Sequence, residues 1–189
     1  MAWPVSLQVG LKEWAVVCAA LEGGRQMVLL RKGGIYEAAG EFELEHREFL
    51  LFPTYLHQKR EMLKLEAQQG VEEGAGEPEE VHFTGAGVVT DIVQLKSRRQ
   101  MDALEGEHIW APELIDMRFN YRPENPLYLM LVRCYRLHEP EVIANTPAYA
   151  GCKSWVPLGA EVATGTALPV LDDLKYEIRK AEIMNRLGK

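Results

Sequence analysis

The sequence predicts an α+β protein built on a mostly antiparallel curved sheet, or on a small barrel, flanked by helices. Its strand-length apolar segments are not regularly separated by helices, which argues against a doubly wound parallel sheet. Gly85 and Gly87 interrupt a long apolar segment, and glycines at such places favour bulges and strong curvature. The 189 residues are 47% hydrophobic and 26% charged, enough for one domain with a real core. We therefore expect a single domain over residues 1–189.

The first half of the chain predicts two helices and two strands. Apolar residues recur at spacings of three and four before the Gly23-Gly24 pair, and this pattern indicates an amphipathic helix; they are Leu11, Trp14, Ala15, Cys18 and Leu21. Residues 26–31 and 48–55 are expected as strands, with Pro53 ending the second or placing it at a sheet edge. Residues 56–69 contain good helix formers, and Thr54 is a natural N-cap for that helix.

The second half begins with an acidic, glycine-containing segment at about 69–80, which we expect to be a flexible loop. Strands and helices then alternate irregularly. We expect strands at 81–95, 127–137 and 154–158, and helices at 97–104 and 171–187. Ser97 is a plausible N-cap of the first helix. Leu174, Ile178 and Ala181 mark the apolar face of the last.

Charge and cysteine usage limit the class of protein. The net charge is −7, but residues 66–80 hold six glutamates and no Lys or Arg, so the remainder is close to neutral. The global acidity therefore does not exclude a nucleic-acid partner, but it argues against strong nonspecific phosphate binding over the whole surface. The three cysteines lack CxxC spacing, which indicates reduced thiols and a cytoplasmic protein. We expect no membrane span and no secretory signal.

The first polar cluster extends from Arg31 to Gln58. Arg31, Lys32, Gly33 and Gly34 follow a predicted strand, and glycine amides beside basic side chains can bind an anion such as phosphate. The spacing is not that of a P-loop, and a hairpin turn with solvated basic residues is the plainer interpretation.

The same cluster holds the candidate catalytic residues. Glu45 and His46 precede the strand at 48–55, and Thr54, His57 and Gln58 follow its core, so these groups can share one rim of the sheet. His46 or His57 could act as a general base, with Glu45 orienting it or acting alone. The alternative is that backbone groups satisfy each of them. A metal site is disfavoured without an HExxH pattern or cysteine support, and we expect no metal and no cofactor.

The second polar cluster lies between residues 108 and 155. Arg118, Tyr121 and Arg122 surround Phe119 in a composition that stacks on bases and holds phosphates. Lys153 and Trp155 add a cation and an aromatic ring before the last strand. Trp110, Phe119 and Trp155 could instead belong to the core.

Four segments together resemble an uncharacterised bacterial family known only as a domain of unknown function. They are LLRKGGI, EHREFLLFPTYLHQ, RFNYRPENPLYLMLVRCYRL and YAGCKSWVPL, and the resemblance covers roughly residues 11–158. A weaker resemblance is to the ASCH branch of the PUA-like superfamily, in which a helix ends in Gly and leads to a strand with a basic residue. That resemblance implies a small β-barrel that binds RNA or modified nucleobases. Some relatives are hydrolases that use a Lys, a Thr and a Glu, whose nearest counterparts here are Lys32, Thr54 and Glu45.

Three functions follow as hypotheses. The favoured one is a module that binds nucleic acid or a nucleotide, either RNA or DNA. The second is a hydrolase or metal-dependent nuclease using Glu45, His46 or His57. The third is a non-enzymatic protein whose acidic loop docks a basic partner, although such a charge run is usually a solvated loop.

Overall fold

The computed structural model describes residues 3–32, 35–38, 41–71, 73–151 and 153–189. Its strands are β1 (Ser6–Trp14), β2 (Val28–Arg31), β3 (Ile35–Ala38), β4 (Glu41–Leu44), β5 (Glu48–Thr54), β6 (Glu80–Leu95), β7 (Leu127–Ala144), β8 (Trp155–Ala163) and β9 (Leu168–Pro169). Its α-helices are α1 (Ala15–Glu22), α2 (Arg98–Asp102), α3 (Pro112–Asn120) and α4 (Asp173–Arg186). Short 3₁₀ turns lie at Arg60–Met62, Leu65–Gly70, Glu105–Glu107 and Pro147–Tyr149.

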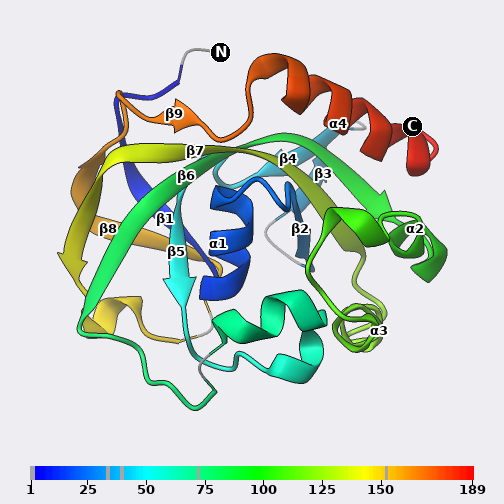
Figure 1. The fold of residues 1–189 in the computed structure, drawn as a ribbon, viewed down its shortest axis with the longest axis horizontal. Coiled ribbons are helices and arrows are strands. Elements are labelled where there is room, and N and C mark those ends of the chain that lie inside the picture. The colour runs from blue at the N-terminus through cyan, green and yellow to red at the C-terminus, as the bar shows by residue number, and fades with distance from the viewer. Residues whose placement is uncertain (1–2, 33–34, 39–40, 72, 152) are drawn as a thin grey trace.

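One curved, mixed sheet organises the molecule. Its strand order is β2-β7-β6-β5-β1-β8, with β9 beside β7, while β3 and β4 form a separate hairpin. Only the β1–β5 pair within that sheet is parallel. In the described part of the chain the edge strands β2 and β8 do not pair, so the sheet is not closed into a barrel. Figure 1 shows β6 and β7 arching over α1. The predicted α+β class with a mostly antiparallel curved sheet is thus confirmed.

The bend in β6 has a local cause. The β6–β7 register shifts between Phe83 and Gly85 and again between Val89 and Asp91, and bulges of this kind increase strand twist. Gly87 lies opposite Cys134, where a Cβ would approach Val132 Cγ1 to 2.7 Å. Glycine at this position lets β6, β7 and the Phe49 ring pack closely. The strand predicted at 81–95 is therefore bent and contains close contacts at glycine, as expected.

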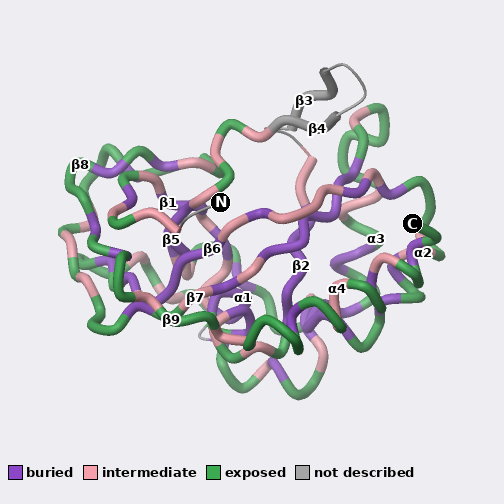
Figure 2. The backbone as a smooth tube through the Cα atoms, turned by 90° about the horizontal axis from the view of Figure 1, so that it is seen from above, coloured by how far each residue is buried: buried purple, intermediate pink, exposed green. Residues whose placement is uncertain are grey.

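The two faces of the sheet bury separate cores, as the strand alternation of β5 makes plain. Phe49 and Leu51 belong to the larger core, which includes α1, whereas Leu50 and Phe52 belong to a smaller one with Val156. Figure 2 shows the buried residues concentrated on α1 and the central strands. No helix in the described residues is long and apolar enough to cross a membrane.

Two predicted helices and two predicted N-caps need correction. Residues 6–14 form β1, so the expected helix begins only at Ala15; it does end at the glycines, where Gly24 has a φ of 68°. Residues 56–69 form two 3₁₀ turns instead of one helix, and Thr54 is the last residue of β5, not an N-cap. α3 was not predicted. Ser97 precedes α2 without a side-chain capping bond.

The buried face of α4 also differs from the predicted one. Leu174 is 71% exposed and Ile178 is 51% exposed, whereas Tyr176 and Ile183 are buried. The Tyr176 hydroxyl lies 2.6 Å from Thr90 Oγ1, and burial raises the pKa of Tyr176 to about 12. A tyrosine whose hydroxyl has a polar partner can thus be the buried residue of a helix, and counting aliphatic residues alone does not identify that face.

An ionic contact holds α4 against the rest of the protein. Arg179 donates to the buried carboxylate of Glu107 at 2.7 Å, and Arg186 reaches the other oxygen of that carboxylate at 3.2 Å. Arg179 also donates to the main-chain oxygens of Gly24 and Arg25. The helix therefore rests on the loop that follows α1.

Candidate functional site

A pocket of about 600 Å³ opens where the ends of β1, β2 and β5 meet the end of α3. We call it the arginine pocket. It is lined by Lys12, Glu13, Trp14, Arg31, Thr54, Leu56, His57, Lys59, Met62, Glu77, Met117, Arg118, Tyr121, Gly151, Lys153 and Ser154. Five of these side chains are Lys or Arg and two are Glu, so the pocket is cationic in a chain whose net charge is −7.

Strand and helix ends bring its polar groups together. Trp14 ends β1, Arg31 ends β2 and Thr54 ends β5, while Arg118 lies in the last turn of α3. β1 and β5 run parallel, and Trp14 is directly opposite Thr54 in their register. The carboxyl ends of parallel strands meet at one edge of a sheet, so the two side chains open at the same edge.

Arg31 is held in place but keeps an unused donor. Its Nη2 lies 3.1 Å from Glu13 Oε2 and donates to the main-chain oxygen of Lys12 at 3.1 Å. Both partners of the Arg31–Glu13 pair are largely buried, with side-chain exposures of 11% and 8%. Arg31 Nε is buried and has no hydrogen-bond partner among the described residues.

The guanidinium of Arg118 has fewer partners within the described part of the protein than that of Arg31. Its Nε is buried without a hydrogen-bond partner, and it makes no ion pair with any described residue. Burial lowers the pKa of the Arg118 guanidinium, the nearby Glu13 carboxylate opposes this, and Arg31 adds to it. An arginine stays charged even so. The pocket therefore contains a largely desolvated cation whose Nε donor is not used by the described part of the protein.

A small internal space adjoins this arginine. It has a volume of about 10 Å³ and is lined by Glu13, Trp14, Leu30, Trp110, Leu114 and Arg118. That is about the volume of a single water molecule by the same kind of measure. Glu13 and Arg118 both border it, so a polar group seated there could contact the unused donor.

An acidic side chain and a strained histidine stand at the rim. The Glu77 carboxylate accepts hydrogen bonds from the Thr54 hydroxyl and from the main-chain N–H of Tyr55. His57 is exposed and has a φ of 62°, a left-handed conformation that costs a residue with a Cβ about 1 kcal/mol. Strain of this kind clusters at functional sites.

The remaining wall is apolar and aromatic. Trp14 is partly buried against the core, while Tyr121 is 55% exposed and Met117 is 43% exposed. Leu56 and Met62 complete this side. The pocket thus combines charged side chains on one side with apolar and aromatic side chains on the other, against which a ring could pack.

The chain matches the model of one protein family over most of its length. The model of a family described as a domain of unknown function, DUF1802, matches residues 10–182. The chain belongs to this family. The resemblance expected from the sequence motifs is confirmed over most of the chain. No curated protein matched the DUF1802 chain.

Among solved structures, similar chains are ASCH proteins from Zymomonas mobilis. A serine-to-alanine mutant of the Zymomonas protein matches with 14% identity and a TM-score of 0.45, covering 95% of the DUF1802 chain and 96% of its own. The ASCH protein itself matches with 12% identity and a TM-score of 0.44, covering 92% and 93% of the two chains.

Several predicted site residues of the DUF1802 chain meet in the arginine pocket. Both polar clusters contribute to it; the residues are Arg31, Thr54, His57, Arg118, Tyr121 and Lys153. The Lys153 amine donates to the main-chain oxygen of Ala148 at 3.4 Å and remains exposed. The structure therefore brings together groups that are up to 122 positions apart in the numbering.

Other predicted binding residues have structural partners elsewhere. The Lys32 amine donates to the main-chain oxygens of Phe119, Tyr121 and Arg122, so it caps the end of α3. The Arg122 guanidinium lies over the Tyr121 ring, 5.3 Å from its centroid. Gly33 and Gly34 lie outside the described residues.

Gln58 and the candidate catalytic pair are likewise placed away from the pocket lining. Gln58 Oε1 accepts from the N–H of Val16 at 3.2 Å and so caps α1, while its Nε2 is buried without a partner among the described residues. Glu45 and His46 form an exposed pair at 3.7 Å, and the His46 ring lies edge-on to Trp155 at 5.4 Å. No described group of three His, Cys, Asp or Glu is arranged to hold a metal.

Sequence reasoning missed several lining residues, most importantly Lys12, Glu13 and Glu77. It assigned the first two to a helix. The alternation of Leu7, Val9 and Leu11 with polar or small residues was the signal for a strand that would have placed Glu13 beside Arg31. Glu77 gave no local signal, since it was one of many acids in a loop.

Proposed function

We propose that this protein binds one nucleotide unit of single-stranded nucleic acid, or a free nucleotide, in the arginine pocket. One observation carries the proposal: Arg31 and Arg118 line the same pocket, and each has a buried Nε without a hydrogen-bond partner among the described residues. A phosphate supplies several acceptor oxygens to such donors in a geometry that suits guanidinium groups.

The charge balance supports phosphate over a carboxylate or a neutral ligand. Glu13 already neutralises one arginine through the 3.1 Å contact with Arg31. The remaining cations of the pocket have no carboxylate partner among the described residues; they are Lys12, Lys59, Arg118 and Lys153. The Glu77 carboxylate at the rim offsets one of these four charges, so an anion of charge near −2 still suits the pocket better than a monoanion.

The apolar wall supports a base on the same ligand. Trp14 and Tyr121 border the pocket together with Met62 and Met117. Aromatic faces stack on any base at about 1–3 kcal/mol per base, and unpaired bases of single strands are the form that can reach them. A pocket of about 600 Å³ is the size of small-molecule sites.

Binding of uridine monophosphate and of a short fluorescent oligouridine tests this proposal. Titration calorimetry measures the first and fluorescence anisotropy the second. Arg118→Met keeps much of the aliphatic stem and removes the charge, so we expect about 10- to 100-fold weaker binding of both ligands. The oligouridine affinity of the wild type should also fall as salt rises.

Arg99→Met is the matched control, because Arg99 is exposed and lies outside the pocket. It should change either affinity by less than about twofold. Thermal unfolding of both variants shows whether they are folded. Equal affinities of wild type and folded Arg118→Met, or no binding of either ligand by the wild type, would contradict the proposal.

The other two functions stay predictions. His57 borders the arginine pocket, but Glu45 and His46 do not. Only one of the three candidate catalytic residues of the hydrolase hypothesis therefore lines this pocket. Docking of a basic partner at the acidic loop and a cytoplasmic location remain expectations from composition alone.

A further inference from the structure

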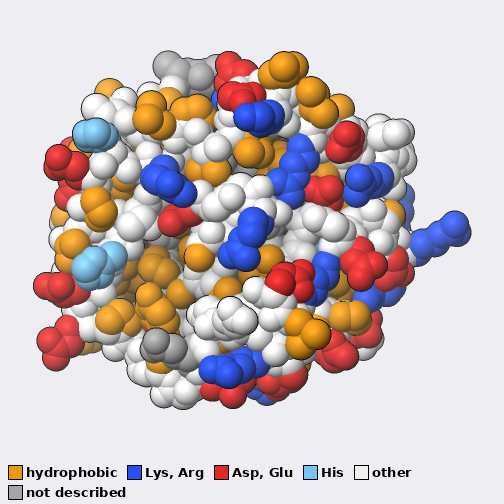
Figure 3. Space-filling view, in the orientation of Figure 1, with side chains coloured by type: hydrophobic (Ala, Val, Ile, Leu, Met, Phe, Trp, Pro, Cys, Tyr) orange, Lys and Arg blue, Asp and Glu red, His pale blue; other side chains and the backbone are white. Residues whose placement is uncertain are grey.

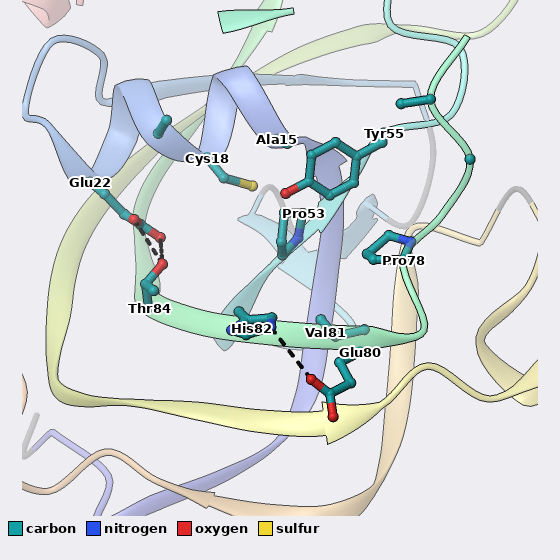
Figure 4. Close-up of a pocket in the computed structure, with 13 residues that line it drawn as sticks. Ala15, Cys18, Glu22, Pro53, Tyr55, Pro78, Glu80, Val81, His82 and Thr84 are labelled. Atoms are coloured by element: carbon teal, nitrogen blue, oxygen red, sulfur yellow. Dashed lines mark hydrogen bonds and ion pairs between the residues drawn. The ribbon is translucent and has the colours of Figure 1, made fainter. Parts of the chain in front are cut away.

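A second pocket, with a volume of about 530 Å³, lies beside α1 and β6. We call it the Glu22 pocket (Figure 4). Small and apolar residues form most of its lining, including Ala15, Ala19, Pro53 and Pro78. In Figure 3, hydrophobic side chains are exposed in a hollow on this face of the molecule.

Glu22 is the least exposed of the charged residues that line it, since the other two, Glu80 and His82, form an exposed pair at 3.8 Å. This residue ends α1, and its carboxylate lies against the backbone of β6. A Cβ on Gly85 would come within 2.6 Å of Glu22 Oε1, so glycine at the β6 bulge makes room for the carboxylate. Strand and helix thus hold this acid in one place.

The carboxylate has fewer donors than it can accept. Thr84 Oγ1 lies 2.9 Å from both Glu22 oxygens, but a hydroxyl has only one hydrogen to donate. The nearby Arg136 guanidinium donates to the main-chain oxygen of Glu22 instead, at 2.8 Å. Glu22 makes no ion pair with any described Lys, Arg or His. A partly buried carboxylate therefore faces the pocket without a direct ion pair, and the nearby Arg136 guanidinium only partly offsets the rise that burial causes in the Glu22 pKa.

Neighbouring groups suit the apolar body of a ligand and disfavour a Cys18 thiolate. Figure 4 shows the Tyr55 ring entering the pocket from the side opposite Glu22, where its face and Pro53 can contact an apolar body. Burial, reinforced by Glu13 and Glu22, raises the pKa of the Cys18 thiol well above its ordinary value. Burial likewise raises the pKa of Glu22, which a bound cation would oppose.

We propose that the Glu22 pocket is a binding site for a small organic ammonium ion with an apolar body. The ammonium group donates to the Glu22 oxygen that Thr84 leaves without a hydrogen, and the apolar body lies between Tyr55 and the alanine face of α1. This site is separate from the arginine pocket, and the proposal does not depend on nucleotide binding.

Three ring compounds of similar shape test it: benzylammonium, benzyl alcohol and benzoate. Titration calorimetry or ligand-observed NMR measures their binding to the full chain. Benzylammonium should bind at least about tenfold more tightly than the neutral and anionic compounds, because only it pairs with the carboxylate. Glu22→Gln keeps the shape and removes the charge, so this preference should disappear.

Ala19→Leu provides a steric test that leaves Glu22 intact. Ala19 is an exposed helix residue on the pocket wall, so leucine can fill the pocket without entering the core. All three compounds should then bind more weakly. Glu61→Gln, an exposed acid outside the lining, is the control for net charge and should keep the preference.

The proposal is overturned if benzylammonium does not bind the wild type, or binds no better than benzyl alcohol. It is also overturned if folded Glu22→Gln retains the preference for the ammonium ion. Uridine monophosphate binding, measured on the same samples, reports the arginine pocket separately and should be unchanged in Glu22→Gln.

Discussion

The arginine pocket and the Glu22 pocket share a wall but present opposite charges. At the end of β5, Thr54 lines the arginine pocket, while its neighbours Pro53 and Tyr55 line the Glu22 pocket. Successive strand residues point to opposite sides of a sheet. One residue step along β5 therefore separates a cationic site from a site with an unpaired carboxylate.

The other two walls divide in the same manner. Trp14, directly before α1, lines the arginine pocket, whereas Ala15 and Glu22 of the helix line the other. In the acidic loop, Glu77 turns to the arginines and its neighbours Gly76 and Pro78 turn away. Neighbouring residues of the same segment thus line different pockets, so the pocket that a charged side chain faces decides which ligand charge it can attract.

The largest effect should come from closing the space that holds Glu22. In Gly85→Ala the new Cβ would stand 2.6 Å from Glu22 Oε1, so the carboxylate or the strand must move, at a cost of about 2 kcal/mol in free energy of unfolding. Urea unfolding measures this cost. Gly159→Ala is the control in β8, since its Cβ would meet nothing closer than the Tyr149 hydroxyl at 3.6 Å. Equal losses in the two variants would show that the glycines matter for strand propensity alone.

A smaller effect should appear in the pH dependence of stability. The folded-state pKa of Glu22 is raised, mainly by burial, so the folded protein binds this proton more tightly than the unfolded chain does. Stability is therefore lost as pH rises from the ordinary value of 4.5 through the raised pKa. Glu22→Gln avoids that loss, and we expect it to be more stable than wild type by up to about 1 kcal/mol at neutral pH.

Urea unfolding at neutral pH and at a pH below 4.5 gives the comparison, because the advantage of Glu22→Gln should vanish at the lower pH. An advantage that is the same at both pH values would contradict the burial of an ionised Glu22.

The smallest expected effect concerns the carboxylate at the rim of the arginine pocket. Glu77 repels an incoming phosphate and occupies the Thr54 hydroxyl, so Glu77→Gln should tighten uridine monophosphate binding about threefold. Glu79→Gln, in the same loop but outside the lining, carries the same charge change. If both variants tighten binding equally, long-range charge and not the local carboxylate sets the affinity.

Local sequence patterns predicted the elements that show one clear hydrophobic periodicity. They failed where the spacing of a strand and that of a helix overlap. The strand at 81–95 and the end of α1 directly before the Gly23-Gly24 pair are confirmed, because alternation and glycine conformation are local properties. Residues 11–14 were misassigned to a helix because Leu11, Trp14 and Ala15 satisfy a helical spacing across the junction of β1 and α1. α4 was located correctly, but Tyr176 and not Leu174 faces the core.

The sequence by itself determined the fold class, the bent glycine-containing strand and the residue types able to bind phosphate or stack on a base. Tertiary structure alone decided which of them share a pocket. Arg31 and Arg118 come together because β2 pairs with β7 and α3 ends beside it. Lys32, one residue further along, instead donates to main-chain oxygens at and just beyond the end of α3. Likewise, the Glu22 carboxylate is held at its pocket by contacts with β6, where Gly85 leaves room for it and Thr84 donates a hydrogen bond to it. Such proximity depends on strand register and helix packing, which no local stretch of sequence encodes.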